Sequence, residues 1–268
     1  MISEQCNKIL CRVRQSSNLI HCITNPISIH LLANSILALG CRPIMAEHPM
    51  EVEEISRNAS AVLLNTGNIT DVRINSMRKA SETANAENIP LILDVAGISC
   101  STFRHGFVCE LLENYNFALV KGNYAEIISL AHPECRTDGV DSGAFDDIYS
   151  VGRICADLSE KYGTRILATG KTDIVSDGRK CIYVYGGDPM LSKVTGTGCL
   201  AGAVCACFLS VENSLMSVAE ACAFIGACAE ISEKGRGCAT FALEFSDNIS
   251  KMTSERFYGM IKMEETIL

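Results

Sequence analysis

The sequence predicts an α/β fold in which a mostly parallel sheet lies between two layers of helices. Short runs rich in β-branched residues alternate along the 268-residue chain with longer segments of helical period. Several runs, such as AVLLN, LILDV and RILAT, are apolar without alternation, which is typical of strands covered on both faces. No internal repeat, low-complexity tract or Pro/Ser-rich linker divides the chain, so we expect a single domain over residues 1–268.

Eight runs are the candidate strands of this sheet. They are Leu19–Thr24, Pro43–Ala46, Ala61–Thr66, Pro90–Val95, Phe117–Val120, Arg165–Thr169, Asp173–Ser176 and Cys181–Tyr185. Three intervening segments have the length of crossover helices: Ser28–Leu39, Asp71–Glu87 and Phe145–Lys161. The last two strands flank Asp177-Gly178, a hairpin signal. Met190–Val194 is also strand-like, and the pattern from Gly196 to the C-terminus is nearly all helical.

Composition excludes several classes of function. The net charge of −8 argues against nucleic acid or an anionic membrane as the main partner, although a small anionic ligand needs only a local pocket. Trp is absent and aromatics make up 6% of the chain, so a base-stacking platform is not expected. No apolar run reaches the ~18–20 residues of a membrane span. Residues 1–16 are polar and amphipathic, unlike a secretory signal, so we expect a cytoplasmic protein.

Fifteen cysteines, an odd number, cannot all pair with one another. Most lie among small apolar residues, as in CLAGAVCACF and ACAFIGACAE, which is typical of reduced thiols in the core of a cytoplasmic protein. No Cys-x-x-Cys pair occurs in the sequence, so a structural zinc site is not expected.

Polar or glycine-containing positions directly follow the buried runs. They are Thr24-Asn25, Met45-Ala46, Asn65-Thr66-Gly67, Asp94, Lys121-Gly122-Asn123 and Thr169-Gly170. Ligands of open α/β sheets bind at the carboxyl ends of the strands, so these positions predict a functional site at one edge of the sheet. Helix N-caps account for part of the same pattern.

The glycine-rich run from Val194 to Ala203, VTGTGCLAGA, carries the strongest chemical signal. Its glycines allow close approach of the backbone, and the helix that follows presents unpaired N–H groups and the positive end of its dipole to an anion. The alternative is a plain tight turn and helix start. The run matches neither a Walker loop nor a dinucleotide fingerprint. Cys199 lies in the first helical turn. Its thiol can be a base or a group that positions a hydroxyl; alternatively, Cys199 is one more small residue in a cysteine-rich chain.

The Gly196-Thr197-Gly198-Cys199 loop with its helical C-terminal layer resembles the anion hole of ribokinase-like kinases, which usually carry Asp where this chain has Cys199. A cysteine there is similar to one branch, the hydroxyethylthiazole kinases of thiamine salvage. Matching stretches follow in the same order along nearly the whole chain. They are His21 to Asn25, Ala33-Asn34, Leu37 to Gly40, Pro43 to Ala46, Ile92 to Asp94, Lys121 to Asn123, Ala125 to Ile127, Ala168 to Gly170, Gly186 to Pro189 and Lys193 to Cys199.

The resemblance implies a three-layer α/β/α ribokinase-like sandwich without a β-lid, assembled as a homotrimer with its sites at subunit interfaces. It implies ATP- and Mg²⁺-dependent phosphorylation of the hydroxyl of 4-methyl-5-(2-hydroxyethyl)thiazole. By position, Asn25, Met45 and Gly196 correspond to the thiazole pocket. Lys121, Asn123 and Thr169 correspond to the ATP site, and Asp94 and Glu126 to the acidic residues near Mg²⁺. The loop from Gly196 through Thr197 and Gly198 to Cys199 corresponds to the site of transfer.

Several of these positions also have a purely structural interpretation. Asp94 can cap a helix, Glu126 can form a capping box with Asn123, and Thr169 can belong to an ordinary turn. Lys121 can be a surface lysine and Met45 a core methionine. His21 is expected to be a packed, hydrogen-bonded residue of its strand.

Three departures from the family pattern stand out. Val95 replaces a usual proline, Lys121 replaces a usual arginine, and the loop from Gly235 to Phe241 carries one extra residue. The competing functions are another ribokinase-like kinase, for an alcohol such as hydroxymethylpyrimidine, and a nucleotide or thiazole sensor without turnover. A hydrolase with Cys199 as nucleophile fits least, because none of the five histidines lies in a recognisable partner motif.

Overall fold

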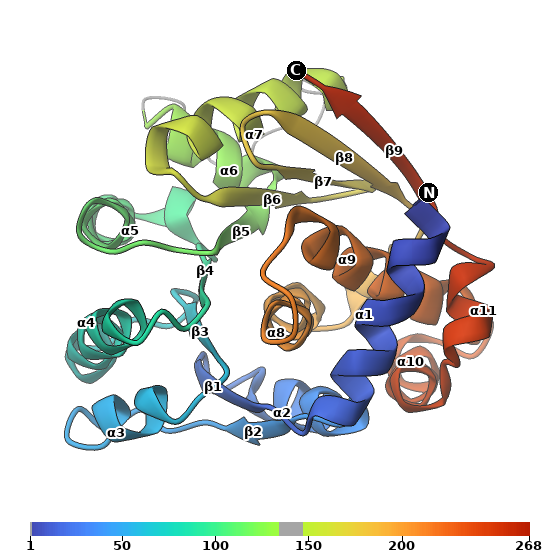
Figure 1. Ribbon diagram of the computed structural model, residues 1–268, viewed down its shortest axis with the longest axis horizontal. Coiled ribbons are helices and arrows are strands. Elements are labelled where there is room, and N and C mark those ends of the chain that lie inside the picture. The colour runs from blue at the N-terminus through green and yellow to red at the C-terminus, as the bar shows by residue number, and fades with distance from the viewer. Residues whose placement is uncertain (1, 134–146) are drawn as a thin grey trace.

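The computed structural model describes residues 2–133 and 147–268, and a nine-stranded sheet runs through its centre (Figure 1). In spatial order the strands are β2 (Arg42–Ile44), β1 (Leu19–Ile23), β3 (Ala61–Asn65), β4 (Leu91–Asp94), β5 (Leu119–Asn123), β6 (Arg165–Thr169), β7 (Thr172–Ser176), β8 (Lys180–Tyr185) and β9 (Lys262–Ile267). Neighbours from β2 to β6 pair in parallel, and those from β6 to β9 pair antiparallel. The sheet is therefore mostly parallel, as predicted.

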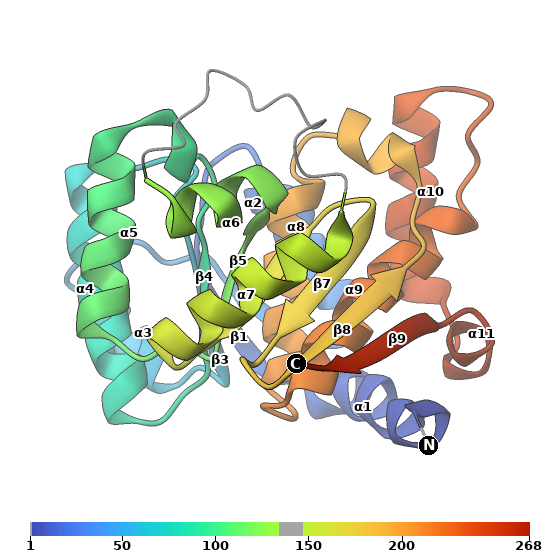
Figure 2. The ribbon, with the colours of Figure 1, turned by 90° about the horizontal axis from the view of Figure 1, so that it is seen from above.

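Helices cover both faces of the sheet (Figures 1 and 2). One layer packs into the first hydrophobic core and consists of α1 (Ile2–Ser16), α2 (Ile29–Ala38), α8 (Thr197–Leu209), α9 (Leu215–Glu230), α10 (Cys238–Lys251) and α11 (Ser254–Tyr258). The other layer packs into the second core and consists of α3 (Val52–Arg57), α4 (Asp71–Ala86), α5 (Thr102–Asn114), α6 (Tyr124–Ala131) and α7 (Ile148–Tyr162). The three-layer architecture of the prediction is confirmed.

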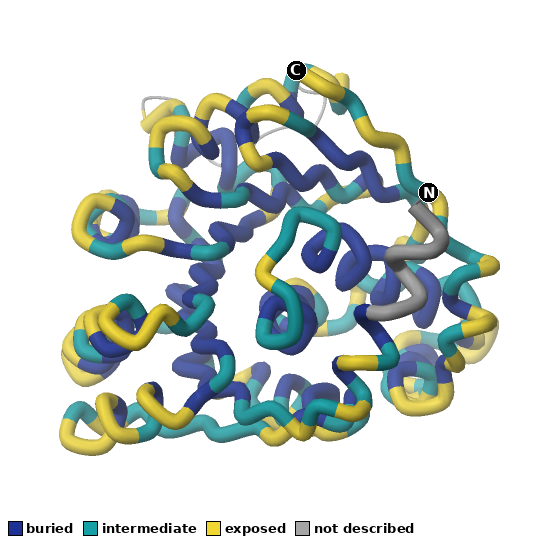
Figure 3. The backbone as a smooth tube through the Cα atoms, in the orientation of Figure 1, coloured by how far each residue is buried: buried dark blue, intermediate teal, exposed yellow. Residues whose placement is uncertain are grey.

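Alternation along each strand divides its side chains between the two cores. On β3, Ala61 and Leu63 join the core beneath α8, whereas Val62 and Leu64 join the core beneath α4 and α5. All five residues of β3 are buried, and Figure 3 shows the central strands dark between helices that are exposed on their outer sides. The apolar runs without alternation arise from this two-sided burial.

The helix starts agree with the local sequence. Asn123, Asp147 and Ser214 each accept a hydrogen bond from a backbone N–H in the first turn of the helix that follows. Helix α8 starts at Gly196 with a φ of 91° and without a side-chain cap, and α2, α3 and α10 also lack one. The N-terminus of α8 is thus left open to a ligand.

Two predicted elements are wrong. Met190–Val194 is not a strand: Pro189–Lys193 form a 3₁₀ helix, η3, because Pro189 occupies its first turn and the Asp188 side chain accepts from Met190 N–H. The C-terminal part is not helical throughout, because Lys262–Ile267 form β9 against β8. The other eight strands and three crossover helices form with small shifts at their ends; Phe145 and Asp146, the predicted start of α7, lie outside the described residues.

Among the residues that the structure describes, eight cysteines are buried: Cys22, Cys41, Cys155, Cys181, Cys205, Cys207, Cys222 and Cys228. Cys100 and Cys238 are exposed free thiols, which the core interpretation did not anticipate. His21 is packed as expected, with its ring nitrogens 2.9 Å from Ser56 Oγ and 2.8 Å from the Ala46 carbonyl. Burial lowers the pKa of His21, so the neutral ring is favoured. In the same part of the chain, no helix has the length and apolarity of a bilayer span.

Candidate active site

Five of the predicted site residues form a row along the carboxyl edge of the sheet. In strand order they are Met45 after β2, Asn25 after β1, Asp94 at the end of β4, Lys121 in β5 and Thr169 at the end of β6. Parallel strands bring their carboxyl ends to the same edge, so residues distant in sequence become neighbours. The first turn of α8 faces the middle of this row, where it packs against β3, β4 and β1.

Three buried polar side chains stand side by side in the middle of the row. Asn65, Asp94 and Lys121 are direct cross-strand partners on β3, β4 and β5. Asn65 Nδ2 donates to Asp94 Oδ2 at 2.8 Å, and Lys121 Nζ donates to Asp94 Oδ1 at 3.1 Å. Both oxygens of the fully buried Asp94 carboxylate therefore have a donor, as an ionised group away from water requires.

Lys121 lies inside this arrangement and not on the surface. Its side chain is 4% exposed. Burial pulls the pKa of Lys121 down, and the negative charges of Asp94 and Glu126 outweigh that effect, so the pKa lies above its ordinary value. Lys121 is thus a charged ammonium that pairs with Asp94 and is stabilised further by the charge of Glu126.

Glu126 has a structural role in addition to any catalytic one. It forms a capping box at the start of α6: Glu126 N–H donates to Asn123 Oδ1 at 2.9 Å, and Glu126 Oε2 accepts from Asn123 N–H at 2.7 Å. The other oxygen, Oε1, accepts from Gly97 N–H at 2.9 Å. A Cβ on Gly122 would lie 2.9 Å from the Glu126 Cβ, so the glycine lets Glu126 approach the sheet edge. Burial raises the pKa of Glu126.

The first turn of α8 brings Cys199 to the same buried group. Its Sγ accepts from Asn25 Nδ2 at 3.2 Å and from Asn65 Nδ2 at 3.4 Å. Thr197 Oγ1 bonds the Leu191 and Val194 carbonyls, which fastens the turn from within. The leading N–H groups of a helix have no partner inside the helix, and Gly198 is exposed. The geometry places the uncapped N-terminus of α8 next to a half-buried thiol.

Thr169 and Met45 lie at opposite ends of the row. Thr169 Oγ1 donates to the Gly122 carbonyl at 3.2 Å, which ties the end of β6 to the end of β5. Met45 is half-buried and packs against the core beneath α8. The row is therefore closed by a polar turn on one side and an apolar side chain on the other.

Asn65 and Arg104 were missed as site residues from sequence. The Arg104 guanidinium binds the carbonyls of Thr66, Gly67 and Ala96, which joins the loops after β3 and β4. Nothing in the local sequence marks Arg104, which stands in an ordinary helical segment. Asn65 did stand among the polar strand ends, and the position of its strand beside β4 would have singled it out.

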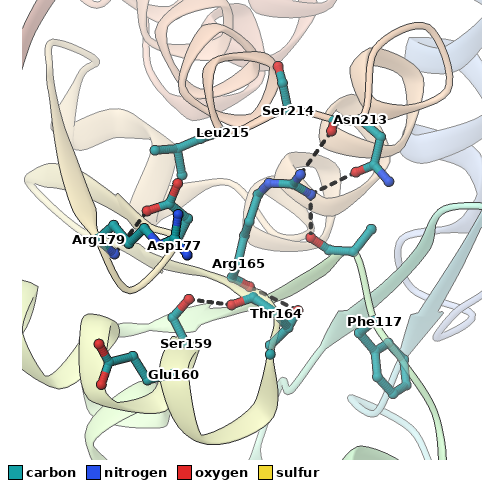
Figure 4. A pocket seen from close by; sticks show the side chains of 12 residues that line it. Phe117, Ser159, Glu160, Thr164, Arg165, Asp177, Arg179, Asn213, Ser214 and Leu215 are labelled. Atoms are coloured by element: carbon teal, nitrogen blue, oxygen red, sulfur yellow. Dashed lines mark hydrogen bonds between the residues drawn. The ribbon is translucent and has the colours of Figure 1, made fainter.

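A hollow of about 780 Å³ lies at the amino ends of β5 and β6, at the opposite end of the strands from the candidate site (Figure 4). Arg165 crosses it and donates to the Ala118 carbonyl at 3.0 Å and to Asn213 Oδ1 at 2.7 Å. Its guanidinium is therefore committed to joining the β5 and β6 starts to the loop between α8 and α9. This hollow lies at the end of the sheet where ligands of α/β folds do not usually bind.

Known proteins of one family match the chain along most of its length. The model of the Hydroxyethylthiazole kinase family matches residues 10–255. A hydroxyethylthiazole kinase from Finegoldia magna is 40% identical over 253 residues, which cover 94% of each chain. The solved structure of the hydroxyethylthiazole kinase protein from Pyrococcus horikoshii OT3 is 31% identical, with a TM-score of 0.89 over 98% of this chain and 99% of that one.

A more distant structure, a ribokinase-like superfamily protein from Enterococcus faecalis V583, is 12% identical with a TM-score of 0.60 over 89% of this chain and 88% of its own. An identity of 12% supports the fold alone, and this fold is the ribokinase-like fold predicted from the sequence. The match over residues 10–255 and the identity to relatives of nearly equal length go further. They show that the chain belongs to the hydroxyethylthiazole kinase family, whose members are phosphotransferases.

Proposed function

We propose that this chain is a single-domain, cytoplasmic kinase that transfers the γ-phosphoryl group of ATP to the hydroxyl of 4-methyl-5-(2-hydroxyethyl)thiazole for thiamine synthesis. The order of side chains along the sheet edge carries the proposal. The residues assigned to the thiazole alcohol, Met45 and Asn25, follow β2 and β1, and those assigned to ATP, Lys121 and Thr169, belong to β5 and β6. The N-terminus of α8 lies between the two groups, where the phosphoryl group has to pass.

Phosphoryl transfer depends on positioning and on neutralisation of charge. In the proposed reaction, the amides of Gly198 and Cys199 and the α8 dipole stabilise the transferring group, because they point at an anion without reorganisation. Thr197 keeps this turn in place through its two backbone carbonyl partners. Lys121 supplies positive charge at the ATP end of the row.

Cys199 positions the substrate hydroxyl in this scheme. Its sulfur already accepts two amide N–H groups, at 3.2 and 3.4 Å, which fixes the side chain before the alcohol arrives. A thiol is a weak base for an alcohol, so orientation of the nucleophile is the larger expected contribution. Asn25 is half-exposed and can exchange its sulfur contact for a substrate atom.

Each oxygen of Asp94 and Glu126 already accepts one hydrogen bond, so these residues would hold a magnesium ion that arrives with the nucleotide through the lone pairs left free. Mg²⁺ in kinases is held by one or two carboxylates together with phosphate oxygens and water, and Asp94 and Glu126 provide two carboxylates. Over the described ranges, no cluster of three or more His, Cys, Asp or Glu side chains could hold a metal by itself. When bound, the ion would neutralise charge on the phosphates.

We propose further that the chain works as a homotrimer with its sites at subunit interfaces. Two exposed apolar side chains at the thiazole end of the row support this: Ile27 is 76% exposed and Met50 is 89% exposed. A neighbouring subunit at this end of the row would bury both side chains, which is favourable for apolar surface. Sedimentation equilibrium of the purified protein tests the trimer.

Product analysis with ATP, Mg²⁺ and the thiazole alcohol tests the function. We expect thiazole phosphate and ADP in equal amounts, and faster turnover of the thiazole alcohol than of hydroxymethylpyrimidine. ADP release that does not depend on the thiazole would refute the assignment, and tight binding without product would indicate a sensor. A Cys199→Ala variant separates the roles of the thiol: a loss of ~10²–10⁴-fold in kcat is the size expected of a base, and a smaller loss indicates positioning.

A further inference from the structure

Asn65 lies at the centre of the buried polar group, and the reaction proposed above assigns no role to it. It is the last residue of β3 and is fully buried. Side chains on a strand alternate between faces, so Asn65 points to the α8 side together with Ala61 and Leu63. The position places it between the Asp94 carboxylate on the neighbouring strand and Cys199 on the helix above.

The Asn65 amide uses all of its hydrogen-bonding capacity at this position. Its Nδ2 donates to Asp94 Oδ2 at 2.8 Å and to Cys199 Sγ at 3.4 Å. Its Oδ1 accepts from Gly67 N–H at 2.9 Å and from Asn25 Nδ2 at 3.4 Å. A side-chain amide has two N–H donors and one oxygen with two lone pairs, so every site has a partner.

Neither of the two side chains of similar size, aspartate and leucine, satisfies these four neighbours. An aspartate at this position would lose both donors and place a second negative charge against Asp94, and a leucine would leave an oxygen of Asp94 and the N–H of Gly67 unpaired in the core. The Asn65 amide also packs closely against Gly67, because a Cβ on Gly67 would lie 2.8 Å from Asn65 Oδ1.

We infer that Asn65 is a positioning residue that holds the Cys199 thiol in register with the Asp94 carboxylate. The inference rests on the proposed function, because it assigns the thiol to the substrate hydroxyl and the carboxylate to the nucleotide end of the site. Asn25 contacts the same sulfur, but it is half-exposed and faces the substrate, so it is free to change partners. Asn65 has no solvent access and keeps the thiol in place throughout the reaction.

A double-mutant cycle on kcat tests the inference. Asn65→Ala is expected to lower kcat by about 10–100-fold, the loss typical when a supporting partner of a site residue is removed, and to leave the KM for ATP within about threefold. In a Cys199→Ala background the same change is expected to cost less than about threefold, because Asn65 acts through the thiol. Equal losses in both backgrounds, or a rise in KM without a change in kcat, would overturn the inference.

A second measurement does not depend on turnover. The rate at which iodoacetamide alkylates Cys199 is followed by peptide mass spectrometry, with the exposed Cys100 and Cys238 as internal references. Asn65→Ala is expected to change the Cys199 rate by about 3–10-fold, the factor that loss of one net hydrogen bond produces, and to leave the reference rates unchanged. An unchanged Cys199 rate would contradict the inference even if the protein phosphorylates another substrate.

Leu64→Val is the matched control. Leu64 precedes Asn65 on β3 and is equally buried, but it points into the other core, beneath α4 and α5. The change shortens a core side chain on the same strand without touching Cys199. We expect unchanged kcat and an unchanged Cys199 alkylation rate. A loss in Leu64→Val as large as that in Asn65→Ala would show that the site responds to any weakening of β3, and would overturn the specific role of Asn65.

Discussion

Lys121 Nζ lies 3.1 Å from Asp94 Oδ1, and both side chains are buried at the carboxyl edge of the sheet. Lys121 is therefore not a surface lysine whose side chain extends to a phosphate. It gives the buried carboxylate a permanent counter-charge, so Lys121 belongs to the framework of the site before any nucleotide binds.

Lys121→Met is expected to destabilise the protein by about 3–5 kcal/mol, because it leaves the Asp94 charge buried without its partner. The free energy of unfolding is measured by urea denaturation. Lys180→Met removes the exposed pair between Lys180 and Glu265 on β8 and β9, and we expect a far smaller change there. If the two variants are equally stable, Asp94 does not depend on Lys121 for its charge.

Glu126→Gln is expected to separate the two roles of that side chain. Glutamine completes the capping box with its single oxygen, but its NH₂ group then faces the Gly97 N–H that Oε1 accepts from, so we expect the free energy of unfolding to fall by about 1–3 kcal/mol. The lost carboxylate should lower kcat/KM for ATP by about 10–100-fold. Steady-state kinetics at varied Mg²⁺ concentration, with urea denaturation alongside, checks both. Full activity in Glu126→Gln would leave the capping box as its only role.

Gly67→Ala is expected to impair the thiazole end of the site. The new Cβ would lie 2.8 Å from Asn65 Oδ1 and 3.2 Å from Asn25 Nδ2, so both amides must shift. We expect a higher KM for the thiazole alcohol and a nearly unchanged KM for ATP. Gly106→Ala in α5 is the control, since its Cβ meets no atom within 4 Å. There, we expect unchanged kinetics and a gain of about 0.5–1 kcal/mol from helix propensity.

Asp173→Asn is expected to change how stability depends on pH. Burial raises the pKa of Asp173 from 3.8 to about 6, although its Oδ1 accepts from Gly170 N–H at 3.0 Å. Because the folded state binds this proton more tightly than the unfolded state, the carboxyl costs stability as the pH rises from about 4 to about 6. Asparagine should remove a loss of roughly 1–3 kcal/mol over that range.

The comparison of unfolding free energies at pH 4 and pH 7 measures this effect, with Asp157→Asn on the exposed side of α7 as a control for net charge. Relative to the wild type, we expect Asp173→Asn to gain stability at pH 7 compared with pH 4, and we expect the control to keep the wild-type difference between the two pH values. The same pH dependence in both variants would locate the titrating group elsewhere.

The seven inner strands could be predicted because burial on both faces produces apolar runs, and the hairpin could be predicted from Asp177-Gly178. The edge strand β2 was also predicted, although it is only partly buried. β9 was missed because Lys262–Ile267 is a mostly exposed edge strand with alternating charged residues, which lacks that signature. Met190–Val194 was misassigned because β-branched Val194 outweighed Pro189, whose ring starts the 3₁₀ helix. Edge strands and short turns depend on neighbours that are distant in sequence.

The site was predictable as a set of strand ends but not as a set of contacts. Asn65 and Cys199 are 134 positions apart, and only the packing of α8 over β3 brings them together. The burial of Lys121 could not be predicted either, because its partner Asp94 lies on another strand. Residue type and strand order give the location of a site. How deeply each side chain is buried depends on how the helix layers pack on the sheet.

The direct pairing of Asn65 with Asp94 and of Asp94 with Lys121 has a consequence for sequence change in this family. A one-residue insertion or deletion inside β4 would turn Asp94 toward the opposite layer and bring an apolar neighbour, Leu93 or Val95, beneath Cys199. Length variation should therefore be tolerated in the loops at the amino ends of these strands and excluded from the strands themselves. A library of single-codon deletions across β3, β4 and β5, selected for thiazole-dependent growth, is expected to return no functional variants from the strands.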